Sequence, residues 1–115
     1  MPIKKGAIYW VDFSSHGNSN SNGLHPALVI QNDALNSSKL NTVSMLAITS
    51  ILKFGELPGN VVLRKGEANL PKKGVINVTQ IKTVQKSCLK DLIGSLTKER
   101  LNQVEEGLKL VLNLS

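Results

Sequence analysis

Polar side chains stand at both ends of a short apolar stretch near the start of the chain. The stretch is Ala27-Leu28-Val29-Ile30, with His25-Pro26 before it and Gln31-Asn32-Asp33 after it. An unbroken apolar run is typical of a strand that is buried on both faces. Pro26 favours an extended conformation for His25 and donates no hydrogen bond to a strand ladder. We therefore expect a functional strand over 23–33, with His25 held at one rim of a sheet and Gln31 at the other.

Two further polar pairs follow apolar segments. Residues 43–50 are mostly apolar and end in Thr49-Ser50, and Thr79-Gln80 begin a segment that alternates polar and apolar residues. The phosphate-binding glycine loops and the paired Cys or His motifs of metal sites are absent from the sequence, and its acidic residues form no close carboxylate pair. The expected site therefore works without a metal and without a cofactor.

Length and composition predict a single domain over 1–115. A chain of 115 residues can bury a core without disulfides, and the one cysteine, Cys88, is expected to be a small buried residue. No apolar run approaches the length that crosses a membrane. We expect a cytoplasmic protein with no membrane partner.

The chain carries a formal net charge of +6 at pH 7. Residues 1–89 hold ten Lys and Arg against four Asp and Glu, whereas residues 90–115 hold four of each, so all of the excess lies in the first part. This distribution fits a polyanionic partner such as RNA, DNA or an acidic protein segment, and it fits a solvated surface equally well. Aromatic residues make up only 3% of the chain, which argues against a stacking platform for single strands.

Runs of β-branched and apolar residues predict a series of short strands before one terminal helix. Leu101, Val104, Leu108 and Val111 are three and four residues apart, as on one face of a helix, and Thr97 suits its N-cap. Gly107 should weaken that helix by about 1 kcal/mol relative to Ala. The expected fold class is mostly β (α+β), a small partly open barrel or twisted sheet with a helix packed on it. The expected strands cover 3–13, 23–33, 43–50, 61–64, 74–79 and 86–95, with a half-exposed segment at 79–84 and a loop at 51–60.

Residues 14–23 form a polar run of Ser, Asn and Gly, interrupted only by His16, that leads directly into the strand of His25. Its turn-forming composition predicts a mobile loop, which in a compact domain is more often functional than a tolerated insertion. His16 is best interpreted as a solvated residue of this loop.

Several segments, in order, resemble the MazF/PemK family of toxin endoribonucleases across nearly the whole chain. They are Lys4-x-Gly6-x-Ile8-Tyr9-Trp10-x-Asp12, the stretch from Gly23 to Asp33 with Asn36, Ala47-Ile48-Thr49-Ser50, Leu57-Pro58 and Gln80-Ile81-Lys82-Thr83-Val84. The resemblance implies an SH3-like barrel, a homodimer, and cleavage of single-stranded RNA at a short sequence by attack of a ribose 2′-hydroxyl. It also implies neutralisation by an acidic MazE-like antitoxin in a type II toxin-antitoxin system.

The resemblance identifies two catalytic positions. Thr49 matches the family's Thr at the end of the third strand, whereas His25 stands where the family usually has Arg. A guanidinium is a permanent fork of donors that stabilises charge on phosphorus, but a histidine is suited to acid–base work. His25 is thus a natural alternative that still cleaves RNA, the mark of a weakened or silent member, or an introduced substitution.

The candidate RNA contacts lie in the polar loop, at strand ends and on nearby lysines. Thr79 replaces a Glu that is common in the family at a position that reads RNA, and Gln80 is suited to hydrogen-bond a base edge. The expected contacts are Ser19, Asn20, Asn22, Gln31, Ser50, Lys53, Thr79, Gln80 and Lys82. Two other classes stay open: a module that binds RNA or antitoxin without cleavage, and a topoisomerase poison on a similar barrel.

Overall fold

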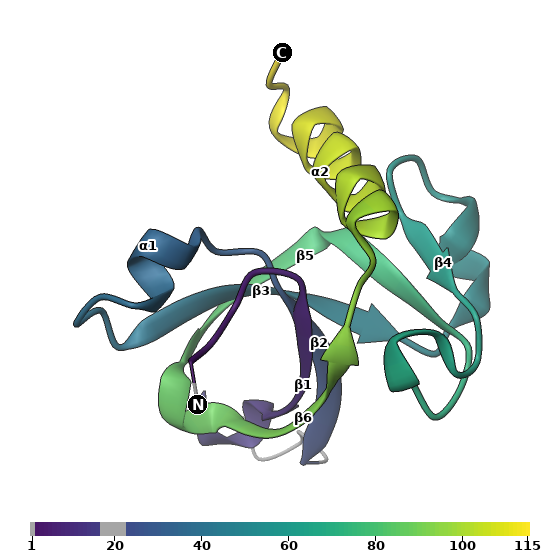
Figure 1. Ribbon diagram of the computed structural model, residues 1–115. Helices are drawn as coiled ribbons and strands as arrows, with labels where there is room; N and C mark the ends of the chain where they lie inside the picture. The colour runs from purple at the N-terminus through teal and green to yellow at the C-terminus, as the bar shows by residue number, and fades with distance from the viewer. Residues whose placement is uncertain (1, 17–22) are drawn as a thin grey trace.

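The strands form one curled antiparallel sheet, and the C-terminal helix packs against it (Figure 1). The computed structural model describes residues 2–16 and 23–115. The strands pair in the order β4-β5-β3-β2-β1-β6, which confirms the expected small, mostly β barrel with a helix. The strands are β1 (Ala7–Asp12), β2 (Leu24–Val29), β3 (Thr42–Thr49), β4 (Val61–Leu63), β5 (Gly74–Gln85) and β6 (Leu89–Ser95). The helices are α1 (Asp33–Asn36), α2 (Lys98–Leu112) and the 3₁₀ turns η1 (Phe13–His16), η2 (Leu52–Glu56), η3 (Glu67–Asn69) and η4 (Lys86–Cys88).

The two faces of the sheet bury two separate apolar clusters. Successive side chains of a strand point to opposite faces, so β1, β2, β3 and β5 contribute buried residues to both clusters, whereas β4 contributes to only one. β2 is buried on both faces as expected, because Ala27, Leu28 and Val29 are fully buried. The cluster that includes α2 contains Ile8, Leu28, Leu46, Ile48, Val61, Leu63, Leu70, Ile76, Val78 and Val104. The other contains Ala7, Tyr9, Val11, Ala27, Val29, Val43, Met45, Val84 and Cys88.

Helix α2 begins where its sequence predicted. Thr97 is the N-cap, and its side-chain oxygen accepts a hydrogen bond from the Arg100 backbone N–H at 3.2 Å. The helix ends at Asn113, which adopts a left-handed conformation with φ of 56°. Within residues 2–16 and 23–115, no helix is long and apolar enough to cross a membrane.

Turn η3 joins the two edges of the curled sheet. It follows the edge strand β4 and contacts the other edge strand β6, where Asn69 Nδ2 donates to the Ile93 carbonyl at 3.1 Å. Gly94 permits this approach, because a Cβ there would lie 2.2 Å from the Ala68 carbonyl oxygen. The turn therefore helps to close the barrel where strand pairing does not.

An ion pair fastens η3 to α2. Arg100 Nε donates to Glu67 Oε2 at 2.6 Å, and Arg100 Nη2 donates to Oε1 at 3.2 Å. The hydrogen bond from Arg100 holds the pKa of the Glu67 carboxyl below its ordinary value. The pair thus contributes fully to stability at pH values above the ordinary pKa of a glutamate. This contribution is lost as the pH falls through the lowered pKa of Glu67.

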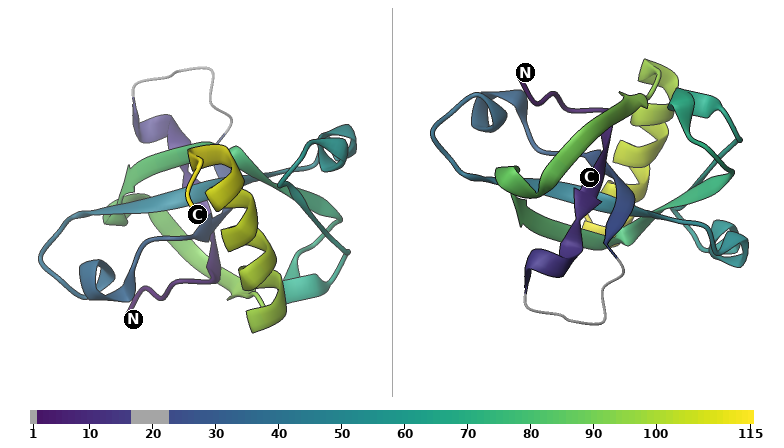
Figure 2. Two further views of the ribbon diagram at one scale, coloured as in Figure 1. Left: turned by 90° about the horizontal axis from the view of Figure 1, so that it is seen from above. Right: turned by 90° about the horizontal axis from the view of Figure 1, so that it is seen from below.

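The structure corrects several sequence-based boundaries. The expected strand over 3–13 is β1 alone, followed by η1 from Phe13, and the expected strand over 86–95 opens with η4, so that β6 starts at Leu89. The expected strand over 23–33 ends at Val29, and Asn32 then caps α1 by accepting a hydrogen bond from the Ala34 N–H at 2.7 Å. The expected strand at 74–79 and the half-exposed segment after it form one long strand, β5. Part of the expected loop at 51–60 is η2, which lies on the opposite side of the molecule from α1 (Figure 2).

Gly107 proves to be a packing residue. It lies in α2 against Gly59, and a Cβ at position 107 would be 2.2 Å from the Gly59 carbonyl oxygen. Gly59 itself has φ of +86°, a backbone conformation that residues other than glycine rarely adopt. The helix therefore tolerates a poor helix former because only glycine allows the two backbones to touch.

We predict that Gly107→Ala destabilises the fold by about 1–3 kcal/mol, because the overpacked contact outweighs a gain of about 1 kcal/mol in helix propensity. Urea unfolding measures the free energy. Asn102→Ala, at an exposed position of the same helix, is the control and should leave stability unchanged or slightly raised. Equal stability of the two variants would contradict the close contact.

Candidate functional site

A groove opens where β2 and β3 stop pairing. β2 pairs with β1 from Leu24 to Leu28, but it pairs with β3 only from Ala27 to Val29. β3 continues past that point to Thr49, which pairs with Val75 of β5. The N-terminal half of β2 and the C-terminal end of β3 therefore form separate walls. Pro26 suits this divergence because it lacks an N–H to donate to a ladder.

The groove has a volume of 910 Å³ and brings together the two catalytic candidates, His25 and Thr49. Ser50 and Lys82, both predicted to contact RNA, line it as well. The residues that line it are Trp10, Phe13, Leu24, His25, Pro26, Ala47, Ile48, Thr49, Ser50, Ile51, Leu70, Pro71, Lys72, Lys73, Gly74, Lys82, Thr83 and Val84.

Thr49 is half-buried and its hydroxyl is held by its own turn. Its Oγ1 accepts a hydrogen bond from the Ile51 N–H at 3.1 Å. Among the described residues no acceptor takes the hydroxyl proton, so Thr49 is able to donate a hydrogen bond into the groove. The Ser50 side chain lies beside it and is exposed.

Phe13 lies beside both His25 and Lys82. Its ring centroid is 6.3 Å from that of His25, with 40° between the ring planes, and 6.0 Å from Lys82 Nζ. Both separations allow weak contacts, of the aromatic and cation–π kinds respectively. Phe13 therefore provides an apolar side to two exposed polar groups. Sequence reasoning missed Phe13 and Trp10, because the low aromatic content hid that both line the same groove.

The groove is basic as well as open. Its lining includes Lys72, Lys73, Lys82 and His25, and it includes no Asp or Glu among the described residues. Across the described part of the chain, no group of three or more His, Cys, Asp or Glu side chains is arranged to hold a metal ion. The lining therefore presents ammonium, imidazole and hydroxyl groups, which suit a phosphate-bearing ligand.

Gln31 lies at the opposite end of β2, inside the protein. Its side chain is 9% exposed and forms three internal hydrogen bonds. Nε2 donates to Asn36 Oδ1 at 2.9 Å and to the Thr42 carbonyl at 3.1 Å, while Oε1 accepts from the Ser44 N–H at 3.3 Å. Gln31 therefore joins β2 to α1 and β3 and does not line the groove.

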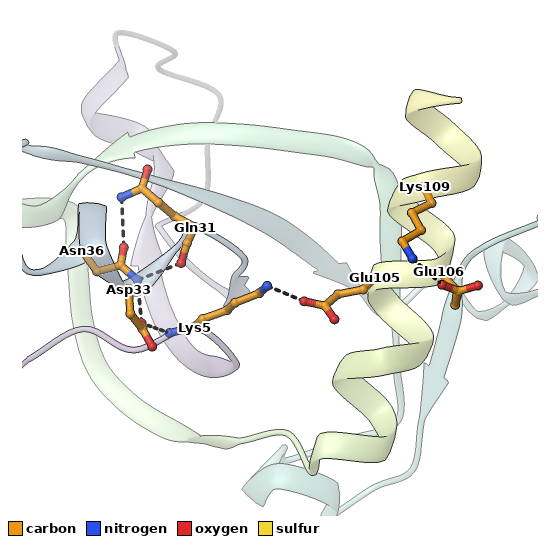
Figure 3. A network of polar contacts seen from close by, with 7 residues as sticks. All are labelled: Lys5, Gln31, Asp33, Asn36, Glu105, Glu106 and Lys109. Carbon is orange, nitrogen blue, oxygen red and sulfur yellow. Dashed lines mark hydrogen bonds and ion pairs between the residues drawn. The ribbon is translucent and has the colours of Figure 1, made fainter. Parts of the chain in front are cut away.

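The neighbouring polar residues extend this network to the N-terminal segment (Figure 3). Asn36 Nδ2 donates to the Gln31 carbonyl at 2.9 Å and to Asp33 Oδ1 at 3.1 Å. The Lys5 N–H donates to Asp33 Oδ1 at 2.7 Å and lowers the pKa of that carboxyl. The Lys5 ammonium in turn pairs with Glu105 of α2. The Gln31-Asn32-Asp33 sequence is thus a structural junction.

Three other predicted RNA contacts, Thr79, Gln80 and Lys53, do not line the groove. Thr79 and Gln80 are exposed and belong to a bulge of β5, because the single residue Ala47 of β3 faces the four residues 77–80. The Thr79 hydroxyl donates to Asn77 Oδ1 at 2.8 Å. Lys53 is exposed on η2. Ser19, Asn20 and Asn22 lie outside the described residues.

The curled barrel carries a basic groove, which among the described residues is lined by no carboxylate and suits a phosphate-bearing ligand. Residues 4–112 match the family described as PemK-like, MazF-like toxin of type II toxin-antitoxin system. Endoribonuclease MazF2 of Mycobacterium bovis is 39% identical over 114 residues, which cover 99% of this chain and 100% of that relative. The chain therefore belongs to the PemK-like, MazF-like toxin family.

Solved structures confirm the fold. An endoribonuclease from a mycobacterial species, in complex with its cognate antitoxin, has a TM-score of 0.80 and 24% identity, with 98% of this chain and 97% of that chain covered. A MazE–MazF complex from Deinococcus radiodurans has a TM-score of 0.80 and 21% identity, with both chains covered completely. The likeness at this identity concerns the arrangement of strands and helix.

We predict that Gln31→Leu destabilises the protein by about 2–4 kcal/mol, because it leaves the Ser44 N–H and the Thr42 carbonyl without their side-chain partner. Denaturant unfolding measures the change. Gln80→Leu, at an exposed position, is the matched control and should change stability little. A Gln31→Leu protein with native stability and weakened RNA binding would instead make Gln31 a contact residue.

Proposed function

We propose that this chain is the toxin of a type II toxin-antitoxin system, a cytoplasmic, metal-independent endoribonuclease that cuts single-stranded RNA at a short sequence. The observation that carries the proposal is the shared groove of Thr49 and His25, lined by lysines and free of carboxylates among the described residues. Membership of the PemK-like, MazF-like toxins and the endoribonuclease names of the relatives support it.

In the proposed reaction the ribose 2′-oxygen attacks the adjacent phosphorus and loses its proton. The bond from phosphorus to the 5′-oxygen breaks, and that oxygen takes up a proton, so the products are a 2′,3′-cyclic phosphate and a 5′-hydroxyl. The Thr49 hydroxyl donates to a non-bridging phosphate oxygen, on which negative charge develops. The Lys82 ammonium adds a positive charge in the same groove.

His25 has a different part in this proposal from that of an arginine. An imidazole moves protons, whereas a guanidinium only donates hydrogen bonds and holds charge. His25 is exposed at the groove wall, beside Phe13, so it is open to the ribose hydroxyl or to the leaving oxygen. We assign it the transfer of one of the two protons.

Incubation of the purified protein with a long RNA in excess chelator tests the activity. We expect cleavage, a loss of about 10²-fold in rate for Thr49→Val, and no loss for the control Thr42→Val at the other end of β3. His25→Ala should also lower the rate, because it removes the imidazole to which one proton transfer is assigned.

Each other outcome of this experiment has a definite meaning. Uncut RNA at every pH, with RNA still bound, would establish a silent binding module in place of an enzyme. Cleavage restored by His25→Arg alone would show a competent fold with an impaired site. Stabilised DNA breaks with intact RNA would show a topoisomerase poison.

The proposed partners are single-stranded RNA, an acidic MazE-like antitoxin and a second copy of this chain. A net charge of +6 and the basic groove favour the two acidic partners. The exposed apolar residues at the end of α2 and just after it support the homodimer, because Leu110 and Leu114 are each 60% exposed.

Light scattering of the purified protein is expected to give the mass of two chains. Leu110→Glu with Leu114→Glu should shift that mass toward one chain, because the charges oppose burial of this surface. The exposed pair Lys39→Glu and Lys65→Glu is the control. A mass of one chain for the native protein at high concentration would exclude the homodimer.

A further inference from the structure

One wall of the groove has no part in the proposed chemistry. It is the turn Leu70-Pro71-Lys72-Lys73, which lies between η3 and β5 and lines the same groove as His25 and Thr49. Both lysines are exposed, and within the described residues neither has an ion pair or a hydrogen-bond partner on its side chain. Two adjacent ammonium groups are therefore held at the groove with their charge uncompensated.

The turn is fixed at both ends, so the fold sets where the backbone of Lys72 and Lys73 lies. Leu70 is 3% exposed and belongs to the core cluster shared with α2. Its carbonyl accepts from the Gly66 N–H at 2.9 Å, and its N–H donates to the Glu67 carbonyl at 3.0 Å. On the other side, Gly74 starts β5 so close to β3 that a Cβ would lie 2.9 Å from Ile48 Cγ2.

We propose that Lys72 and Lys73 bind backbone phosphates of the RNA strand on the opposite side of the groove from His25. This inference rests on the proposed ribonuclease function and extends it, since it names where the strand is held away from the reacting phosphate. Lysine ammonium groups contact phosphates as point charges without reading bases. The pair therefore provides affinity for single-stranded RNA in general, and sequence choice resides elsewhere.

RNA is favoured over an acidic protein segment as the occupant because of what the groove contains. The two lysines share the groove with the Thr49 hydroxyl, which is able to donate a hydrogen bond, and with the exposed imidazole of His25. Both groups can act on a phosphodiester, which RNA contains and a protein segment lacks. An RNA strand that reaches Thr49 passes along the walls of this groove, one of which carries the two lysines. Binding of an antitoxin segment by these lysines is an outcome that the experiment distinguishes.

The test compares Lys72→Ala/Lys73→Ala with Lys39→Ala/Lys65→Ala. The control removes the same two charges from exposed positions that do not line the groove. With an RNA that the native protein cuts, we expect the first variant to raise KM about tenfold at low salt with kcat unchanged, because phosphate contacts are made equally in the ground and transition states. A plot of the logarithm of the binding constant against the logarithm of the salt concentration has a negative slope. Its magnitude should decrease by about 1.4, since each of the two phosphate contacts to a single strand contributes about 0.7.

A second readout separates this inference from the ribonuclease function. Binding of a single-stranded DNA oligonucleotide, which has no 2′-hydroxyl and is not cut, should show the same loss and the same reduced slope. If the native protein cuts no RNA but the lysine variant loses oligonucleotide binding, the proposed activity fails and the phosphate site stands. Both variants should unfold at the native midpoint, because all four side chains are exposed.

Three results would overturn the inference. Equal losses in the two variants would mean that net charge acts at a distance, without a local contact. A lower kcat with unchanged KM and salt slope would place the lysines in the chemistry instead. Native RNA binding together with lost binding of an acidic MazE-like antitoxin would assign the turn to the protein partner.

Discussion

The register of β2 against β3 is the constraint on which the groove depends. Ala27 faces Ala47 and Val29 faces Met45, and beyond Ala27 the two strands part. Because side chains alternate along a strand, a slip of one residue would turn Thr49 to the other face of β3. The hydrogen bonds of Gln31 to the backbone of Thr42 and Ser44 oppose such a slip. A buried amide at one end of β2 thus helps the strand pairing to fix which face of β3 carries Thr49.

The two ends of β2 differ because they meet different surroundings. At the C-terminal end Gln31, Asn32 and Asp33 satisfy backbone groups of α1, β3 and the N-terminal segment, so their polarity is consumed inside the protein. At the N-terminal end the β3 ladder is absent, and His25 is left at an open wall among positive charges. Polar residues therefore stabilise the fold at the C-terminal end of β2, whereas at its N-terminal end His25 is available to a ligand.

The sequence predicted most of the strands, the N-cap at Thr97 and the helix after it, because these features depend on local periodicity and capping. It also placed Thr49 and His25 at strand ends that prove to share a groove. It misplaced Gln31, since a polar residue after a strand gives no sign of whether its partners are internal. Other features arise from residues that are distant in sequence. Phe13 lies beside His25 and Lys82, Lys72 shares the groove with Thr49, and Gly107 packs against Gly59. Residue spacing along the chain carries no signal for such contacts.

The position of β1 in the sheet bears on how the protein is made. β1 lies between β2 and β6, and Ala7 near the start of the chain pairs with Ser95 near its end. During synthesis β1, β2 and β3 can pair early, but the second edge of β1 stays open until β6 has left the ribosome. An open edge is a site for wrong pairing, and contacts between distant residues form slowly. The sheet is therefore complete only after β6 (Leu89–Ser95) has been synthesised and has paired with β1.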